Sequence, residues 1–166
     1  MQNQSRIVIE NIYPQLNSGD VFIKRVVDEI VNVTADVLVD GHDIIQTSLK
    51  FKHQSEKKWS EVRMQPTSND EYTASFTTTK QGFYSYKVEG WVDYALNWQH
   101  GIERKIDDHQ HVNSELLEGA ELLEFAIKKA NKTEKDYLKN LVVLFKTEAS
   151  YNEAIEEATS EKLKSI

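Results

Sequence analysis

The sequence predicts an α+β chain in which an antiparallel, immunoglobulin-like β-sandwich is followed by a segment of an α-helical bundle. Short β-rich runs separated by turn residues fill the chain up to about residue 93. From residue 94 onward, apolar residues recur at helical spacing. Charge divides near the same place: residues 1–106 hold 12 Lys and Arg against 14 Asp and Glu, whereas residues 107–166 hold 8 against 13. We therefore predict two domains, a β-sandwich over residues 1–93 and an incomplete helical insert over residues 94–166.

The first strands are predicted from short runs of β-branched residues. Residues 6–12 form one run, residues 17–20 (Asn-Ser-Gly-Asp) form a turn, and residues 21–27 form a second run. Between residues 31 and 39, Val or Ala occupies every second position. This period of two is typical of a half-buried strand.

A tight hairpin is predicted at Asp40-Gly41, because both residues tolerate the positive φ that such a turn needs. Residues 44–51 would then be the returning strand. Three further strands are predicted at residues 59–64, 72–78 and 83–92. Seven short strands with turns at this spacing indicate a sandwich of two antiparallel sheets.

The helical part begins with apolar residues that recur every four positions: Tyr94, Trp98, Ile102 and Ile106. A second stripe with steps of four and three consists of Leu116, Ala120, Leu123, Ile127 and Ala130. Helices are then predicted over residues 134–147 and 151–164, with Thr133 and Ser150 as N-caps. Residues 141–145 are apolar on all sides, so we expect that stretch to lie centrally.

Composition excludes several classes of site and protein. The chain has no cysteine, so it forms neither disulfides nor thiolate metal sites. A net charge of −7 argues against nucleic acid as a partner. No apolar run approaches the ~18 residues of a membrane span, and residues 1–5 lack the features of a secretory leader. We expect a cytoplasmic protein.

No residue set in the sequence forms a catalytic motif. The pair His109 and His111 lies in an expected connection between helices, where a solvated loop is the better interpretation than a metal site. The acidic pairs Asp40/Asp43 and Asp107/Asp108 lack the apolar surroundings that would raise one pKa for acid catalysis. We therefore expect no catalytic residue, no cofactor and no metal.

Aromatic residues are the remaining candidates for a binding site. Trp59, Trp91 and Trp98 lie in or beside the strand region, together with several tyrosines. Flat rings on a sandwich can stack on sugar faces, but large rings are also what a core is built from. Both interpretations stay open, and we name the three tryptophans as candidate sugar contacts.

Several strings taken together carry a family resemblance. They cover residues 6–14, 24–27, 35–43, 69–70, 82–86, 91–93 and 118–123. Their order and spacing resemble the N-terminal region of bacterial alpha-1,4-glucan:maltose-1-phosphate maltosyltransferases, members of the alpha-amylase superfamily. The resemblance is dense over residues 6–124, and the Asp40-Gly41-His42-Asp43 turn is its most telling string.

This resemblance implies a fold and a role. Enzymes of this family transfer maltosyl units from α-maltose 1-phosphate to an α-1,4-glucan, on a catalytic barrel that lies downstream of the region resembled here. Their N-terminal β-sandwich is interrupted by a helical insert, and both parts contribute to a homodimer interface. By this resemblance the chain is a fragment that stops inside the insert, and no catalytic residue is carried over to it.

Two positions depart from the family pattern: Asp28 stands where a glycine is usual, and Gly90 where an alanine is usual. Two functions follow as hypotheses. The first is a non-catalytic assembly and dimerisation module of a maltosyltransferase in α-glucan biosynthesis. The alternative is a stand-alone or appended α-glucan-binding module.

Overall fold

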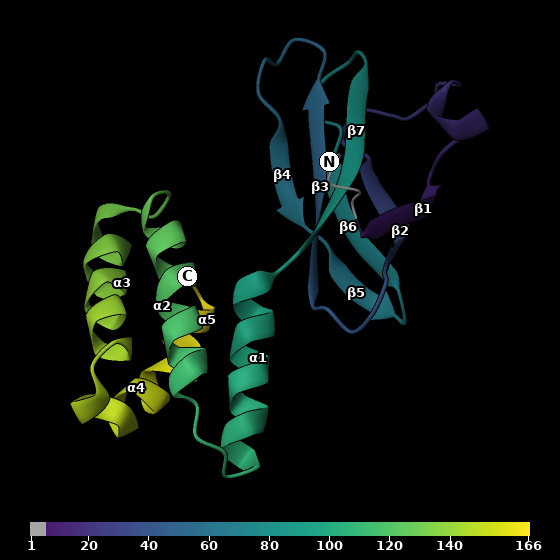
Figure 1. Cartoon of the computed structure of the whole chain (residues 1–166). Helices are drawn as coiled ribbons and strands as arrows, with labels where there is room; N and C mark the ends of the chain where they lie inside the picture. Colours follow the sequence, from purple (N-terminus) through teal and green to yellow (C-terminus); the bar gives the residue numbers. More distant parts are fainter. Residues whose placement is uncertain (1–5) are drawn as a thin grey trace, which may run out of the picture. The chain divides into compact units, whose positions relative to one another are not determined.

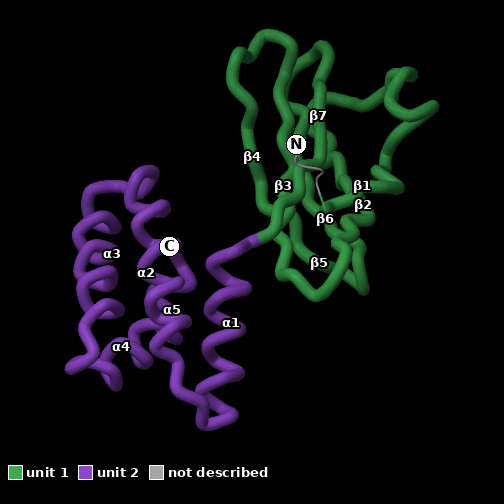
Figure 2. Tube along the Cα trace, viewed as in Figure 1, with its two compact units in different colours: residues 1–92 green, residues 93–166 purple. Residues whose placement is uncertain are grey.

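The structure, a computed structural model, describes residues 6–166 and divides into two compact units, residues 1–92 and residues 93–166 (Figure 2). Residues 1–5, on which part of the argument against a secretory leader rests, lie outside the described residues. Each unit has a core of its own. The combination of antiparallel sheets and helices confirms the α+β class (Figure 1).

The first unit contains two antiparallel sheets (Figure 1). The first sheet has the strand order β1-β2-β6-β5, with β1 at Ile7–Tyr13, β2 at Ile30–Val39, β5 at Gln65–Ser68 and β6 at Glu71–Thr77. The second has the order β4-β3-β7, with β3 at Ile45–His53, β4 at Ser60–Arg63 and β7 at Tyr84–Val92. The alternation predicted for residues 31–39 is confirmed, because Val33 and Val37 are fully buried on one face of β2.

The two sheets share one hydrophobic core. It takes valines from β2, Leu49 from β3, Phe76 from β6 and Val88 from β7. The ring of Phe51 on β3 stacks on the ring of Phe76 on β6, with centroids 4.6 Å apart. This ring pair therefore joins one sheet to the other.

The predicted hairpin at Asp40-Gly41 is wrong. Gly41 does adopt a positive φ of 103°. However, β2 already pairs with β1 and β6, so both of its edges are occupied. The chain crosses instead to the second sheet, where β3 pairs with β4 and β7.

The predicted strand over residues 21–27 is also wrong. Between β1 and β2 the chain forms a short 3-10 helix, η1 (Asn17–Gly19), and a single bridge between Leu16 and Val21. Val21 and Phe22, which would lie on opposite faces of a strand, are 49% and 79% exposed, so neither face of this run is buried against the core. The strand β5, which contains Pro66, was missed; an edge strand is the place in a sheet where proline is tolerated.

Asp28 occupies a backbone conformation that favours glycine. Its φ is +67°, and its N–H donates to the Thr78 carbonyl at 2.7 Å. A glycine at this position would take the same backbone shape without strain.

Replacing Asp28 with glycine is expected to stabilise the chain by about 1 kcal/mol, because a left-handed backbone costs roughly that much at a residue with a Cβ. Urea unfolding measures the change. Asp20→Gly is the matched control: Asp20 is exposed with a φ of −75°, so glycine there adds only backbone freedom to the unfolded state. A stabilisation at Asp20 equal to that at Asp28 would contradict the explanation.

The second unit consists of helices. They are α1 (Tyr94–Asp107), α2 (Asn113–Ile127), α3 (Lys132–Phe145), α4 (Tyr151–Ala158) and α5 (Glu161–Lys164), with a 3-10 turn η2 (Glu148–Ser150) before α4. The four-residue repeat from Tyr94 is confirmed as α1, which begins where the Asp93 carboxylate accepts from the Leu96 N–H.

The predicted caps of the later helices need correction. The N-cap of α3 is Asn131 and not Thr133, and Asn131 forms a capping box with Glu134. Ser150 is the N-cap residue of α4, as predicted, but its side chain makes no capping hydrogen bond. Residues 151–164 form two helices, because Ser160 starts a new one by accepting from the Leu163 N–H.

Trp98 lies at the centre of the helical core. It is 7% exposed, its ring centroid lies 5.8 Å from that of Phe145, and its Nε1–H donates to the Glu115 carbonyl at 2.6 Å. Gly119 on α2 makes room for this ring: a Cβ there would lie 2.1 Å from Trp98 Cζ2. Residues 141–145, expected to lie centrally, place Leu141 and Phe145 in the helical core, whereas Val143 is 66% exposed.

Candidate functional site

The outer face of the β4-β3-β7 sheet carries two of the three tryptophans. Leu49 and Val88 point into the core, so their neighbours on β3 and β7 point outward. Lys50 lies opposite Lys87 on β7 and Glu61 on β4. We call this surface the tryptophan face, and it consists of Lys50, Lys52, Trp59, Glu61, Arg63, Lys87, Glu89 and Trp91.

Cations stand over both indole rings of the tryptophan face. The Lys52 and Lys87 ammonium groups lie 4.8 Å and 5.2 Å from the ring centroid of Trp59. The Arg63 guanidinium lies 4.4 Å from the ring centroid of Trp91. These are favourable cation–π distances. Trp59 remains 37% exposed, and Trp91 is half-buried.

An ion-pair network fills the space between the tryptophans. Glu89 accepts from Lys50 at 2.6 Å and from Lys87 at 2.5 Å, and Lys50 also lies 3.8 Å from Glu61. The hydrogen bond from Lys50, reinforced by Lys87, lowers the pKa of Glu89 below its ordinary value of 4.5. The same bond raises the pKa of Lys50. Both partners therefore stay charged at neutral pH.

Acid is expected to destabilise the chain partly through Glu89. Because its pKa is lower in the folded chain, its contribution is present above about pH 4.5 and is lost as the pH falls through the folded pKa. Glu89→Gln should therefore make the urea midpoint less dependent on pH in the acid range. Glu10→Gln, at an exposed position of β1, is the control and should keep the wild-type dependence. Identical acid dependence of Glu89→Gln and wild type would contradict this role.

The other aromatic candidates lie elsewhere. Trp98 is in the core of the helical unit, as described above. Tyr72, Tyr84 and Tyr86 pack against the core of the first unit. The candidate sugar contacts that share one surface are thus Trp59 and Trp91.

The paired acids and histidines weighed from the sequence lie near the turn after β2, at the end of α1 and in the connection that follows α1. Asp43 forms an ion pair with Arg6 at 3.0 Å, and Asp107 ends α1. The backbone of His109 turns at a φ of +56° after that helix, and the His111 ring lies 5.7 Å from that of Tyr151. Among residues 6–166, no three His, Asp or Glu side chains are grouped closely enough to hold a metal ion.

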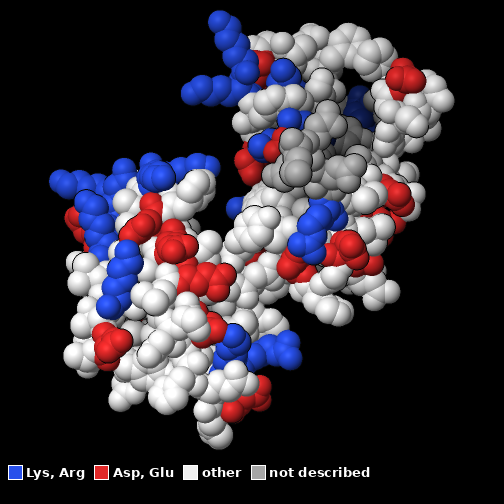
Figure 3. Space-filling view, viewed as in Figure 1, with Lys and Arg blue, Asp and Glu red and all other residues white. Residues whose placement is uncertain are grey.

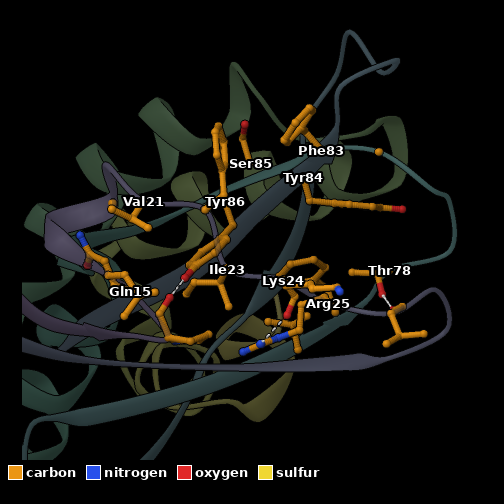
Figure 4. Close-up of a pocket in the computed structure, with 18 of the residues that line it drawn as sticks. Gln15, Val21, Ile23, Lys24, Arg25, Thr78, Phe83, Tyr84, Ser85 and Tyr86 are labelled. Carbon is orange, nitrogen blue, oxygen red and sulfur yellow. Dashed lines mark hydrogen bonds between the residues drawn. The ribbon is translucent and has the colours of Figure 1, made fainter.

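A second feature, an apolar groove, was not predicted. It has a volume of about 730 Å³ and is lined by residues of the 12–31 and 76–87 segments (Figure 4). Six of its apolar side chains are 43–79% exposed: Leu16, Val21, Phe22, Val26, Val27 and Phe83. One feature of the sequence could have indicated this groove: residues 21–27 are rich in apolar residues but do not alternate between apolar and polar as a half-buried strand would.

Side-chain contacts connect the two segments that line the groove. The Phe22 and Phe83 rings meet with centroids 4.9 Å apart. The Tyr86 hydroxyl on β7 donates to the Pro14 carbonyl, and the Thr78 hydroxyl donates to the Val26 carbonyl at 2.7 Å (Figure 4). Beside the groove, β7 pairs with β3 on one side, and no strand of residues 6–166 pairs with its other edge. Such an edge is normally covered in a complete protein.

A smaller cavity of about 670 Å³ lies at the Asp40–Asp43 turn. Its lining includes His42, Asp43, Gln46, Gln65 and Arg63. Because Arg63 also stands over Trp91, this polar cavity adjoins the tryptophan face.

Charge on the surface is mixed. Both Lys and Arg and Asp and Glu are visible on each unit (Figure 3). None of the helices in the part of the chain that the structure describes has the length and apolar character to cross a lipid bilayer.

Comparison with known proteins gives a consistent result. Residues 5–166 match the family model described as alpha-1,4-glucan:maltose-1-phosphate maltosyltransferase, domain N/S. The maltosyltransferase of Chlorobaculum tepidum is 34% identical over 95% of this chain. Those of Methylacidiphilum infernorum and Myxococcus xanthus are 36% and 38% identical, each over 75% of the chain. The chain spans 23% of the first relative's length and 19% of that of each of the other two.

Proposed function

This chain belongs to the alpha-1,4-glucan:maltose-1-phosphate maltosyltransferase domain N/S family, and from that membership we propose that it is the non-catalytic N-terminal assembly module of such an enzyme. The parent protein would transfer maltosyl units to an α-1,4-glucan on a catalytic barrel of the alpha-amylase type. The short span of the chain relative to its relatives supports placing that barrel outside residues 1–166. A phosphorylated sugar as donor favours a cytoplasmic location.

The strand order supports an immunoglobulin-like sandwich with a helical insert. The sheets β1-β2-β6-β5 and β4-β3-β7 follow the arrangement in which the first, second, fifth and fourth immunoglobulin strands share one sheet. In that fold the strand equivalent to β7 has a further neighbour on its open edge. The helices that follow β7 stand where an insert would interrupt the sandwich.

The apolar groove beside β7 is the observation that carries the assembly role. Six large side chains exposed together exceed the scattered apolar residues of an ordinary surface. We propose that this surface is buried in a homodimer, with the helical unit contributing a second contact area.

Sedimentation velocity over a wide range of protein concentration tests the proposal. The wild-type chain should form a dimer as its concentration rises, and Phe22→Lys/Val26→Lys should remain monomeric because two charges would be buried at the contact. Val8→Lys is the matched control, since Val8 is 48% exposed and lies outside the groove. The proposed dimer surface would be contradicted by a wild-type chain that stays monomeric at every concentration. It would also be contradicted by a Val8→Lys variant that loses dimerisation as fully as the double variant.

A further inference from the structure

The tryptophan face has the geometry of an extended platform. Trp59 precedes Ser60, which lies opposite Phe51, whereas Trp91 lies opposite Gln46 near the other end of β3. At the usual rise of a strand, the two indoles stand about 15–20 Å apart along the sheet. A ligand that contacts both indoles must therefore be long and must cross β3 obliquely, from the β4 side to β7.

The charges of this face are satisfied within it. Lys50 and Lys87 share Glu89, and Lys52 rests on an indole ring. An apolar helix would have to remove these ion pairs from water without replacing their hydration, which is costly. An anion would have to compete with the carboxylate that already holds two lysines. The face thus disfavours both kinds of partner.

A neutral polyhydroxyl chain avoids both costs. Its sugar rings have apolar faces that can lie against indoles, and its hydroxyls can accept from ammonium groups and donate to carboxylates that remain paired. The Lys52, Lys87 and Arg63 side chains that stand over the rings are long enough to move aside and bond to hydroxyls. The polar cavity next to Arg63 extends the hydrogen-bonding surface beyond Trp91.

We propose that the tryptophan face binds a linear α-1,4-glucan that crosses β3 obliquely, stacked on Trp59 beside β4 at one end and on Trp91 of β7 at the other. The identity of the glucan rests on the proposed function, since the relatives are named for that polymer. The site would hold the polymer on the module.

Indole NMR of the tryptophan-labelled 166-residue chain tests this site directly. Maltoheptaose is added to about 10 mM, enough to detect dissociation constants near 1 mM. The Nε1–H signals of Trp59 and Trp91 should move with one common dissociation constant, and the Trp98 signal should stay in place. Trp98 is thus an internal control, because it is buried in the helical unit.

Substitutions complete the test. Trp59→Ala and Trp91→Ala should each weaken binding by about threefold to tenfold, the size of one aromatic contact. Phe83→Ala removes an exposed ring of the groove and should leave the affinity unchanged. Circular dichroism confirms that each variant is folded.

The proposal is overturned by absent shifts, by shifts confined to Trp98, or by an equal response to a cello-oligosaccharide of the same length. Failure of the glucan-binding proposal would leave the proposed assembly role unaffected, because that role is tested separately by sedimentation velocity. Conversely, a strictly monomeric chain whose tryptophan signals still respond to maltoheptaose would retain the glucan site and lose the dimer.

Discussion

Replacing Gly119 with alanine is expected to destabilise the helical unit by about 3 kcal/mol, the upper range for forcing extra volume into a packed core. The added Cβ would fall 2.1 Å from Trp98 Cζ2, a distance that no packing tolerates. The indole would have to leave its place and give up its hydrogen bond to the Glu115 carbonyl. Urea unfolding and the chemical shift of the Trp98 indole measure the effect.

Gly101 provides a matched control on α1. No atom lies within 4 Å of a Cβ built there, so alanine should stabilise the helix by about 0.5–1 kcal/mol through propensity alone. Two Gly→Ala changes in helices are thus expected to have opposite signs. Trp98→Phe combined with Gly119→Ala should lose less stability than the sum of the two single changes. Equal effects at the two glycines, or strict additivity in the double variant, would contradict the packing described.

Replacing Phe76 with alanine is expected to cost about 3–5 kcal/mol, as for other buried Phe→Ala changes. Phe76 is 6% exposed and contacts Phe51, Tyr84 and Tyr86, all of which belong to the opposite sheet. Its loss would remove the ring cluster that holds the two sheets on one core. The unfolding free energy of the first unit measures the change.

Phe83→Ala is the control for this loss. Phe83 is 58% exposed, so the same truncation should change stability by only about 0.5 kcal/mol. If both phenylalanine variants unfold at the same urea concentration, the two sheets do not depend on the shared core.

The sequence predicted the elements whose burial pattern is local. The alternation over residues 31–39 became β2, and the four-residue repeat from Tyr94 became α1. Both patterns report one buried face, and burial of one face determines the type of element. Residues 21–27 were wrongly predicted as a strand, and the strand at residues 65–68 was missed. Both errors arise because strand formation depends on pairing partners that sequence spacing does not reveal.

Non-local contacts explain the remaining differences. A glycine turn after β2 predicts a reversal of direction, but not whether the next strand joins the same sheet. The role of Trp98 depended on the missing side chain of Gly119, which lies on another helix. Trp59 and Trp91 lie on the same face of the sheet because of the register of β4 and β7 with β3, which the sequence does not show. The apolar groove required the three-dimensional path of residues 14–29 beside β7.

The most direct test of the central claim is to isolate the native protein with an antibody raised against this chain and to measure its size and activity together. We expect a polypeptide several times longer than 166 residues that releases phosphate from α-maltose 1-phosphate when an α-1,4-glucan is present. A native polypeptide of 19.2 kDa without this activity would contradict the account of the chain as a maltosyltransferase module.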